Sequence, residues 1–133
     1  MLSLVTPQFA NEILDLYLLS KTVESKDKTT VGIAKRLYDD ESWSYKVSDL
    51  LHAIAAWYES PAHMLEAVAN VLTFGAAKYE RHNWKRCEED WRYEDAAHRH
   101  ALALLKGEEK DEESGLHHMD HILCNLMFLE YLS

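Results

Sequence analysis

The chain has 133 residues, of which 47% are apolar and 28% are charged, so it encodes a globular protein and not a disordered tail. Lysine and arginine total 14 against 23 aspartate and glutamate residues, which gives a formal net charge of −9. This acidic balance argues against nucleic acid and anionic lipid as partners, because binding to either needs a basic surface.

The first twenty residues do not have the pattern of a signal peptide. No basic segment precedes their apolar stretch, and acidic residues interrupt it. No apolar run anywhere approaches the ~18 residues that a membrane span needs. Cys87 and Cys124 lie far apart in the sequence, and we expect both to be free thiols in a reducing compartment. The sequence therefore predicts a cytoplasmic protein.

Composition and spacing together predict an all-α fold. The chain has only 4 glycines and 2 prolines, and apolar residues recur at the spacing of helices. We expect one domain over residues 1–133, a compact bundle of about five to six helices. The segment 1–60 is expected to be a helical N-terminal part of unknown role, and 61–133 the functional core. The expected helices run over about 7–19, 31–39, 48–58, 61–79, 91–106 and 116–131.

Several residues have the chemistry of helix ends. Ser48 and Asp90 are suited to cap the helices that follow them, and Ser60-Pro61 combines an N-cap with a proline at the first helical position. Gly107 is placed to end the fifth helix.

The last expected helix is apolar nearly all round between residues 122 and 132. A helix without a polar face is either central in its domain or buried at a subunit interface. A small bundle has little surface to cover such a helix, so we expect a homo-oligomer.

Two helices carry polar groups on faces that should be buried. His118, His121 and Asn125 are spaced i, i+3 and i+7 on the last helix and form one stripe. On the preceding helix, His100 is in register with apolar residues one turn away on either side. Burying such groups without partners costs roughly 1–3 kcal/mol each, so the stripe indicates a hydrogen-bond network or a site.

Imidazoles at this spacing can reach one divalent metal ion or one phosphate. We expect His100, His118 and His121 to be metal ligands, with Asp111 or Glu113 as the source of an oxygen ligand. The expected ion is Mg²⁺, Mn²⁺ or Co²⁺, and mixed histidine and carboxylate ligation suits a transition metal better than calcium. In the alternative interpretation, the histidines are core hydrogen-bonding groups and the acidic loop 108–113 is a solvated turn.

Further candidates lie on either side of this cluster. Asp95 lies four residues before Arg99 and three before His98, so it can orient either one. The charge of Arg99 suits phosphate, and Asp95 and Glu113 are the candidate catalytic carboxylates.

A second candidate region follows the long helix. Lys78 is suited to phosphate, Tyr79 and Trp84 to stacking on a base, and Asn83 to reading a base edge. An ordinary helix end with two core aromatic residues explains the same pattern. Gly75, inside the helix, costs about 1 kcal/mol relative to alanine, so it serves close packing, ligand approach or the end of the helix.

The segment 65–129 resembles a known family, the phage-encoded N-terminal domain of dATP/dGTP diphosphohydrolases. The resemblance is carried by VLTFGA (71–76), KY (78–79), HNW (82–84), DAA (95–97), RH (99–100), GE (107–108), Asp111, ESG (113–115), His118, His121 and Asn125. It implies purine deoxynucleotide handling in the cytoplasm of a phage-infected host, with Lys78, Tyr79, Asn83, Trp84, Arg99 and Asn125 as nucleotide-binding residues. In fused members, a following MazG-like half supplies ExxE and ExxD metal sites.

Three functions are compatible with these features. The first is a metal-dependent nucleotide phosphohydrolase acting on substrates like dATP and dGTP. The second is a non-catalytic sponge that sequesters a nucleotide second messenger of host immunity, an anti-defence role. The third is a structural or interaction protein whose histidines only hold the core.

Overall fold

The computed structural model describes residues 5–20, 30–38, 47–78 and 91–132, and over these ranges the chain is all-α. They contain six helices, which confirms the predicted fold class: α1 (Pro7–Ser20), α2 (Thr30–Tyr38), α3 (Val47–Trp57), α4 (Pro61–Lys78), α5 (Trp91–Leu105) and α6 (His118–Leu132). Among these residues, no helix is both long enough and apolar enough to cross a bilayer.

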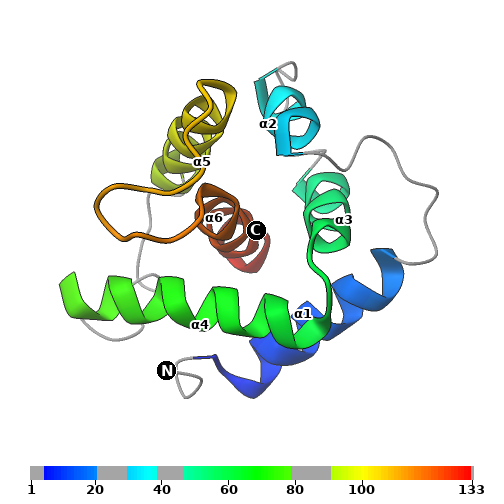
Figure 1. Cartoon of the computed structure of the whole chain (residues 1–133). Coiled ribbons are helices and arrows are strands. Elements are labelled where there is room, and N and C mark those ends of the chain that lie inside the picture. Colours follow the sequence, from blue (N-terminus) through cyan, green and yellow to red (C-terminus); the bar gives the residue numbers. More distant parts are fainter. Residues whose placement is uncertain (1–4, 21–29, 39–46, 79–90, 133) are drawn as a thin grey trace.

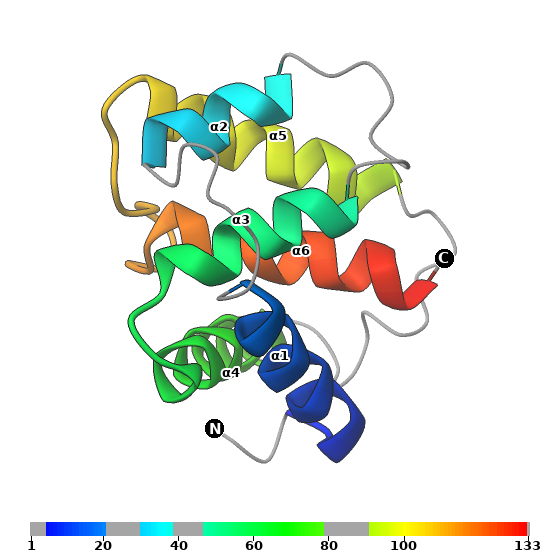
Figure 2. The ribbon, with the colours of Figure 1, turned by 90° about the vertical axis from the view of Figure 1, so that its right-hand side faces the viewer.

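The helices form three layers of two (Figure 2). Helices α2 and α5 make one outer layer, α3 and α6 the middle layer, and α1 and α4 the other outer layer. Helix α6 packs against α5, α3 and α4, and Figure 1 shows it end-on between them.

The central position of α6 explains its composition. Every residue from His121 to Leu129 is buried, including Ile122, Leu123 and Leu126 with no exposed surface. Because one chain covers this helix, its apolar surface no longer argues for a subunit interface. The homo-oligomer stays a prediction.

The predicted helix ends are confirmed in part. Ser60 Oγ accepts a hydrogen bond from the backbone N–H of His63 at 3.1 Å, as an N-cap does. Gly107 follows α5 with a φ of 90°, a left-handed conformation that glycine adopts at low cost. Ser48 is not a cap, because α3 begins one residue earlier. Asp90 lies outside the described residues.

The last helix begins at His118, two residues later than expected. The loop before it folds back on itself, since Asp111 N–H donates to the Leu116 carbonyl at 2.8 Å and His118 N–H donates to the Glu109 carbonyl at 2.9 Å. These backbone bonds compete with helix formation at residues 116 and 117. They also hold the acidic loop against the start of α6.

Candidate metal centre

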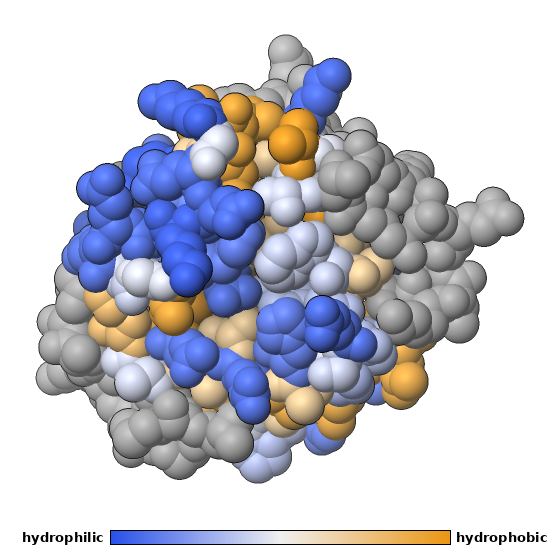
Figure 3. Space-filling model, in the orientation of Figure 1, coloured by the Kyte–Doolittle hydropathy of each residue, from blue (hydrophilic) through white to orange (hydrophobic). Residues whose placement is uncertain are grey.

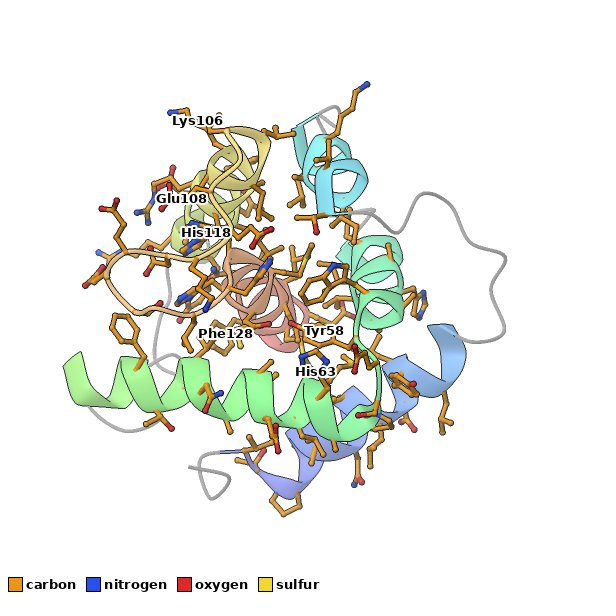
Figure 4. All side chains as sticks on the ribbon, viewed as in Figure 1. Tyr58, His63, Lys106, Glu108, His118 and Phe128 are labelled. Atoms are coloured by element: carbon orange, nitrogen blue, oxygen red, sulfur yellow. The ribbon has the colours of Figure 1, made fainter. Side chains whose placement is uncertain are left out.

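The packing of α5 on α6 brings two predicted metal ligands into direct contact. The Nδ1 atoms of His100 and His118 lie 2.7 Å apart. The loop between the two helices adds Asp111, so that one ligand atom from each of these three residues lies within 4.8 Å of the others. Figure 4 places His118 beneath this loop, and Figure 3 shows a hydrophilic surface on the same side of the molecule.

His121 lies beside the three residues. Its ring stacks on that of His100, with centroids 4.4 Å apart and planes 4° apart. Its Nε2 contacts Ser114 Oγ at 2.7 Å and is 3.9 Å from Asp111 Oδ2. His121 therefore belongs to the same cluster, although a serine hydroxyl occupies the nitrogen nearest to Asp111.

Hydrogen bonds in the loop hold the Asp111 carboxylate in place. Oδ2 accepts bonds from both the backbone N–H and the hydroxyl of Ser114, each at 2.9 Å. Because the serine proton goes to the carboxylate, Ser114 Oγ is an acceptor toward His121, and Nε2 of His121 carries the proton. Nδ1 of His121 is then the nitrogen without a proton.

Burial keeps the imidazoles of His100 and His121 neutral near pH 7. Burial, followed by the neighbouring rings of His121 and His118, lowers the pKa of His100 to about 3. Burial also lowers the pKa of His121, against the opposing effect of the Asp111 charge. Partial burial by itself raises the pKa of Asp111, but the two Ser114 hydrogen bonds outweigh it and the pKa lies below its usual value. The cluster thus combines neutral imidazoles with an ionised carboxylate.

This charge state favours a metal over a phosphate as the ligand of the cluster. A phosphate is bound best by protonated imidazoles, whereas a metal needs their neutral form with a free lone pair. Two imidazoles and a carboxylate are a ligand set that first-row divalent metals accept.

Within the described residues, one fully buried ring nitrogen of the cluster lacks a hydrogen bond. Nε2 of His118 is buried and lies 3.4 Å from Glu108 Oε1, within ion-pair distance but without the alignment of a hydrogen bond. A buried nitrogen in this state is costly, and native structures usually keep such groups for a reason.

The other predicted site residues are placed differently. Asp95 and Arg99 form an exposed i, i+4 ion pair on α5, with Nε and Oδ2 3.3 Å apart. Glu113 is exposed in the turn, near enough to His121 to raise the pKa of that imidazole. Asn125 is buried, but its amide donates to the backbone carbonyl of His121 at 2.9 Å, within its own helix. We expected this amide to point to a shared cavity with the imidazoles, and the bond directs its nitrogen to the backbone instead.

The second candidate region is largely outside the described residues. Tyr79, Asn83 and Trp84 fall in the segment 79–90, and the side chain of Lys78 is not described. Gly75 lies three residues before the end of α4, so it does not end the helix. A Cβ at Gly75 would meet no described atom within 4 Å, so close packing there does not explain the glycine.

Sequence reasoning missed two residues of the cluster, Ser114 and Glu108. The sequence feature that could have pointed to this loop is its acidic spacing, Glu108-x-x-Asp111 and Glu109-x-x-Glu112. In a helix these spacings would put two carboxylates on one face. Here the residues lie in a turn, where Asp111 groups with His100 and His118 and Glu108 approaches Nε2 of His118.

Comparison with known proteins agrees with the resemblance seen in the sequence. Residues 44–133 match the profile of the family described as "dATP/dGTP diphosphohydrolase, N-terminal". The chain belongs to this family.

The family match begins at residue 44, earlier than the segment on which the resemblance rests, and therefore takes in α3 as well as the cluster. A protein of Salmonella phage PMBT28 named dATP/dGTP diphosphohydrolase is 45% identical over 67 residues, which is 50% of this chain. The match covers 23% of the length of that relative. No solved structure matches the chain.

Proposed function

We propose that this chain acts on purine deoxynucleotides as a metal-dependent phosphohydrolase domain. The observation that carries the proposal is the cluster of neutral imidazoles beside an ionised Asp111, in a chain of the dATP/dGTP diphosphohydrolase N-terminal family. The substrate class, dATP and dGTP, comes from the name of the family and of the phage relative. The host cytoplasm is the expected location.

His100, His118 and Asp111 would hold the divalent ion, with His121 beside them. When bound, the ion supplies Lewis-acid polarisation of a phosphate group and activation of water. Mn²⁺ and Co²⁺ fit two imidazoles better than Mg²⁺ does, since Mg²⁺ prefers oxygen ligands.

The remaining charged residues have roles around this centre. Arg99 directly precedes His100 in the sequence and exposes its guanidinium, which would offset the charge of a phosphate. Asp95 orients that guanidinium through their ion pair. Glu113, exposed near His121, would accept a proton from water. Base recognition by Tyr79, Asn83 and Trp84 stays a prediction.

The test is turnover of dATP and dGTP by the purified chain with Mg²⁺, Mn²⁺ or Co²⁺. Products are separated by anion-exchange chromatography, and Asp111→Asn is compared with Glu112→Gln, an exposed loop residue that loses the same charge. The proposal predicts cleaved nucleotide that disappears in Asp111→Asn and persists in Glu112→Gln. Tight binding with recovery of intact nucleotide after denaturation would contradict hydrolysis and support sequestration.

A further inference from the structure

The buried Nε2 of His118 marks a residue outside the predicted ligand set. The carboxylate oxygen Oε1 of Glu108 lies 3.4 Å from this nitrogen. His118 is almost fully buried, whereas the Glu108 side chain is 44% exposed. Figure 4 shows Glu108 directly above His118. One small rotation of the Glu108 side chain would therefore complete a hydrogen bond without moving the histidine.

Backbone hydrogen bonds fix the position of the Glu108 main chain at the end of α5. Its N–H donates to the Ala103 carbonyl at 2.9 Å, and the N–H of Gly107 donates to the Leu104 carbonyl at 3.0 Å. The left-handed φ of Gly107 makes this closing turn of α5 possible. The carbonyl of the following residue, Glu109, accepts the N–H of His118, so the chain around Glu108 is bonded to α5 on one side and to His118 on the other.

The two nitrogens of His118 must play opposite roles. If Nδ1 carried the proton, Nε2 would hold a buried lone pair facing a carboxylate, and the two would repel. With the proton on Nε2, that nitrogen faces an acceptor and Nδ1 has its lone pair directed at His100. In the metal-free cluster, His100 Nδ1–H then donates to His118 Nδ1 across the 2.7 Å contact.

We propose that Glu108 is a positioning residue, which fixes the Nε2–H tautomer of His118 and so presents the Nδ1 lone pair to a divalent metal. This inference rests on the proposed function for the presence of the metal. Carboxylates that accept the second N–H of a metal-bound histidine orient the ring and make the ligand more basic, and losing one typically weakens metal affinity 10- to 100-fold.

The tautomer is tested first, in metal-free protein, by long-range ¹H–¹⁵N NMR of the imidazoles. Wild type is expected to show His118 protonated on Nε2, and Glu108→Ala is expected to show a mixture of tautomers. Glu112→Ala is the matched control and keeps the wild-type spectrum. A proton on Nδ1 in wild type, or an unchanged tautomer in Glu108→Ala, would overturn the inference whether or not the protein binds a metal.

The second measurement is calorimetric titration with Co²⁺. Glu108→Ala is expected to bind 10- to 100-fold more weakly than Glu112→Ala, and Glu108→Gln, which keeps an acceptor oxygen without the charge, to fall between them. Equal affinities in the two alanine variants would overturn the positioning role. Absence of binding in wild type, with the Nε2–H tautomer observed, would overturn the metal in the proposed function but leave the tautomer assignment standing.

Discussion

The imidazoles of His100 and His118 meet nitrogen to nitrogen, with Nδ1 atoms 2.7 Å apart across the interface of α5 and α6. Neutral rings can approach this closely only if one nitrogen carries a proton and the other accepts it. To hold a divalent ion with both Nδ1 atoms, His100 would have to carry its proton on Nε2 instead of Nδ1, which would break this hydrogen bond. The contact is thus a structural feature of the metal-free cluster and the basis of the predictions below.

Replacing both histidines with leucine tests whether the pair serves stability. Each single variant, His100→Leu or His118→Leu, is expected to lower the free energy of unfolding by about 1–3 kcal/mol, because the remaining half-buried nitrogen loses its partner. The double variant is expected to cost less than the sum of the two, since no imidazole is left unpaired. Urea unfolding of the four proteins measures this, and strict additivity would contradict it.

Substitutions in the core around α6 and on the surface show how large the losses of unfolding free energy in the histidine variants are by comparison. Ile122 is fully buried, so Ile122→Ala is expected to cost about 2–5 kcal/mol through lost contacts and a cavity. Leu102 on α5 is 41% exposed, and Leu102→Ala is expected to cost much less. Similar losses of unfolding free energy in both variants would contradict the central position of α6.

Stability should fall as the pH falls from about 6.5 toward 3. The folded protein holds His100 with a pKa of about 3 and His121 with a lowered pKa, so the unfolded chain binds more protons in this range. Each such imidazole costs up to about 1.4 kcal/mol per pH unit between the two pKa values. Above pH 6.5 both states are neutral and the contribution is complete. Urea unfolding across this range should give a shallower dependence in His100→Asn, and identical slopes would count against neutral imidazoles in the fold.

Ser114→Ala should raise the pKa of Asp111. The hydroxyl proton of Ser114 stabilises the ionised carboxylate, and alanine keeps the backbone N–H but removes that proton. The variant also leaves His121 Nε2 without its serine partner, so a loss of about 1–2 kcal/mol of unfolding free energy is expected. NMR titration of the Asp111 carboxyl carbon reads the shift, and an unchanged or lower pKa would be inconsistent with the network.

A hydrogen bond between α6 and the residue after α3 gives a test that does not change a predicted metal ligand. Tyr58 OH donates to Asp120 Oδ1 at 2.6 Å, and burial, followed by the Asp120 charge, raises the pKa of this tyrosine well above its usual value. Tyr58→Phe is expected to cost about 1–2 kcal/mol. A cycle with Asp120→Asn should show coupling between the two residues. Fully additive changes in the free energy of unfolding would mean that the hydrogen bond contributes nothing to stability.

Periodicity and end chemistry predicted much of this fold. The Ser60-Pro61 start of α4 and the end of α5 at Gly107 follow from local preferences that act within one turn of helix. The central place of α6 follows from a composition that leaves no polar face. The stripe of His118 and His121 was visible because helix geometry fixes which side chains share a face.

The rest depends on contacts that no local pattern encodes. The loop 108–117 folds back through backbone bonds such as Asp111 to Leu116, which replace the first turn expected for α6. The roles of Ser114 and Glu108 depend on that loop. The inward-facing polar group Asn125 was expected in the site, but its amide bonds to its own helix, because an amide four residues after a carbonyl can reach it without any tertiary partner.

The most direct test of the account is calorimetric titration of chelator-treated protein with Co²⁺ at pH 7.5, comparing wild type with the His100→Leu, His118→Leu double variant. The account predicts a single ion bound per chain in wild type and none in the double variant, which remains folded. No binding by wild type, or equal binding by both proteins, would contradict it.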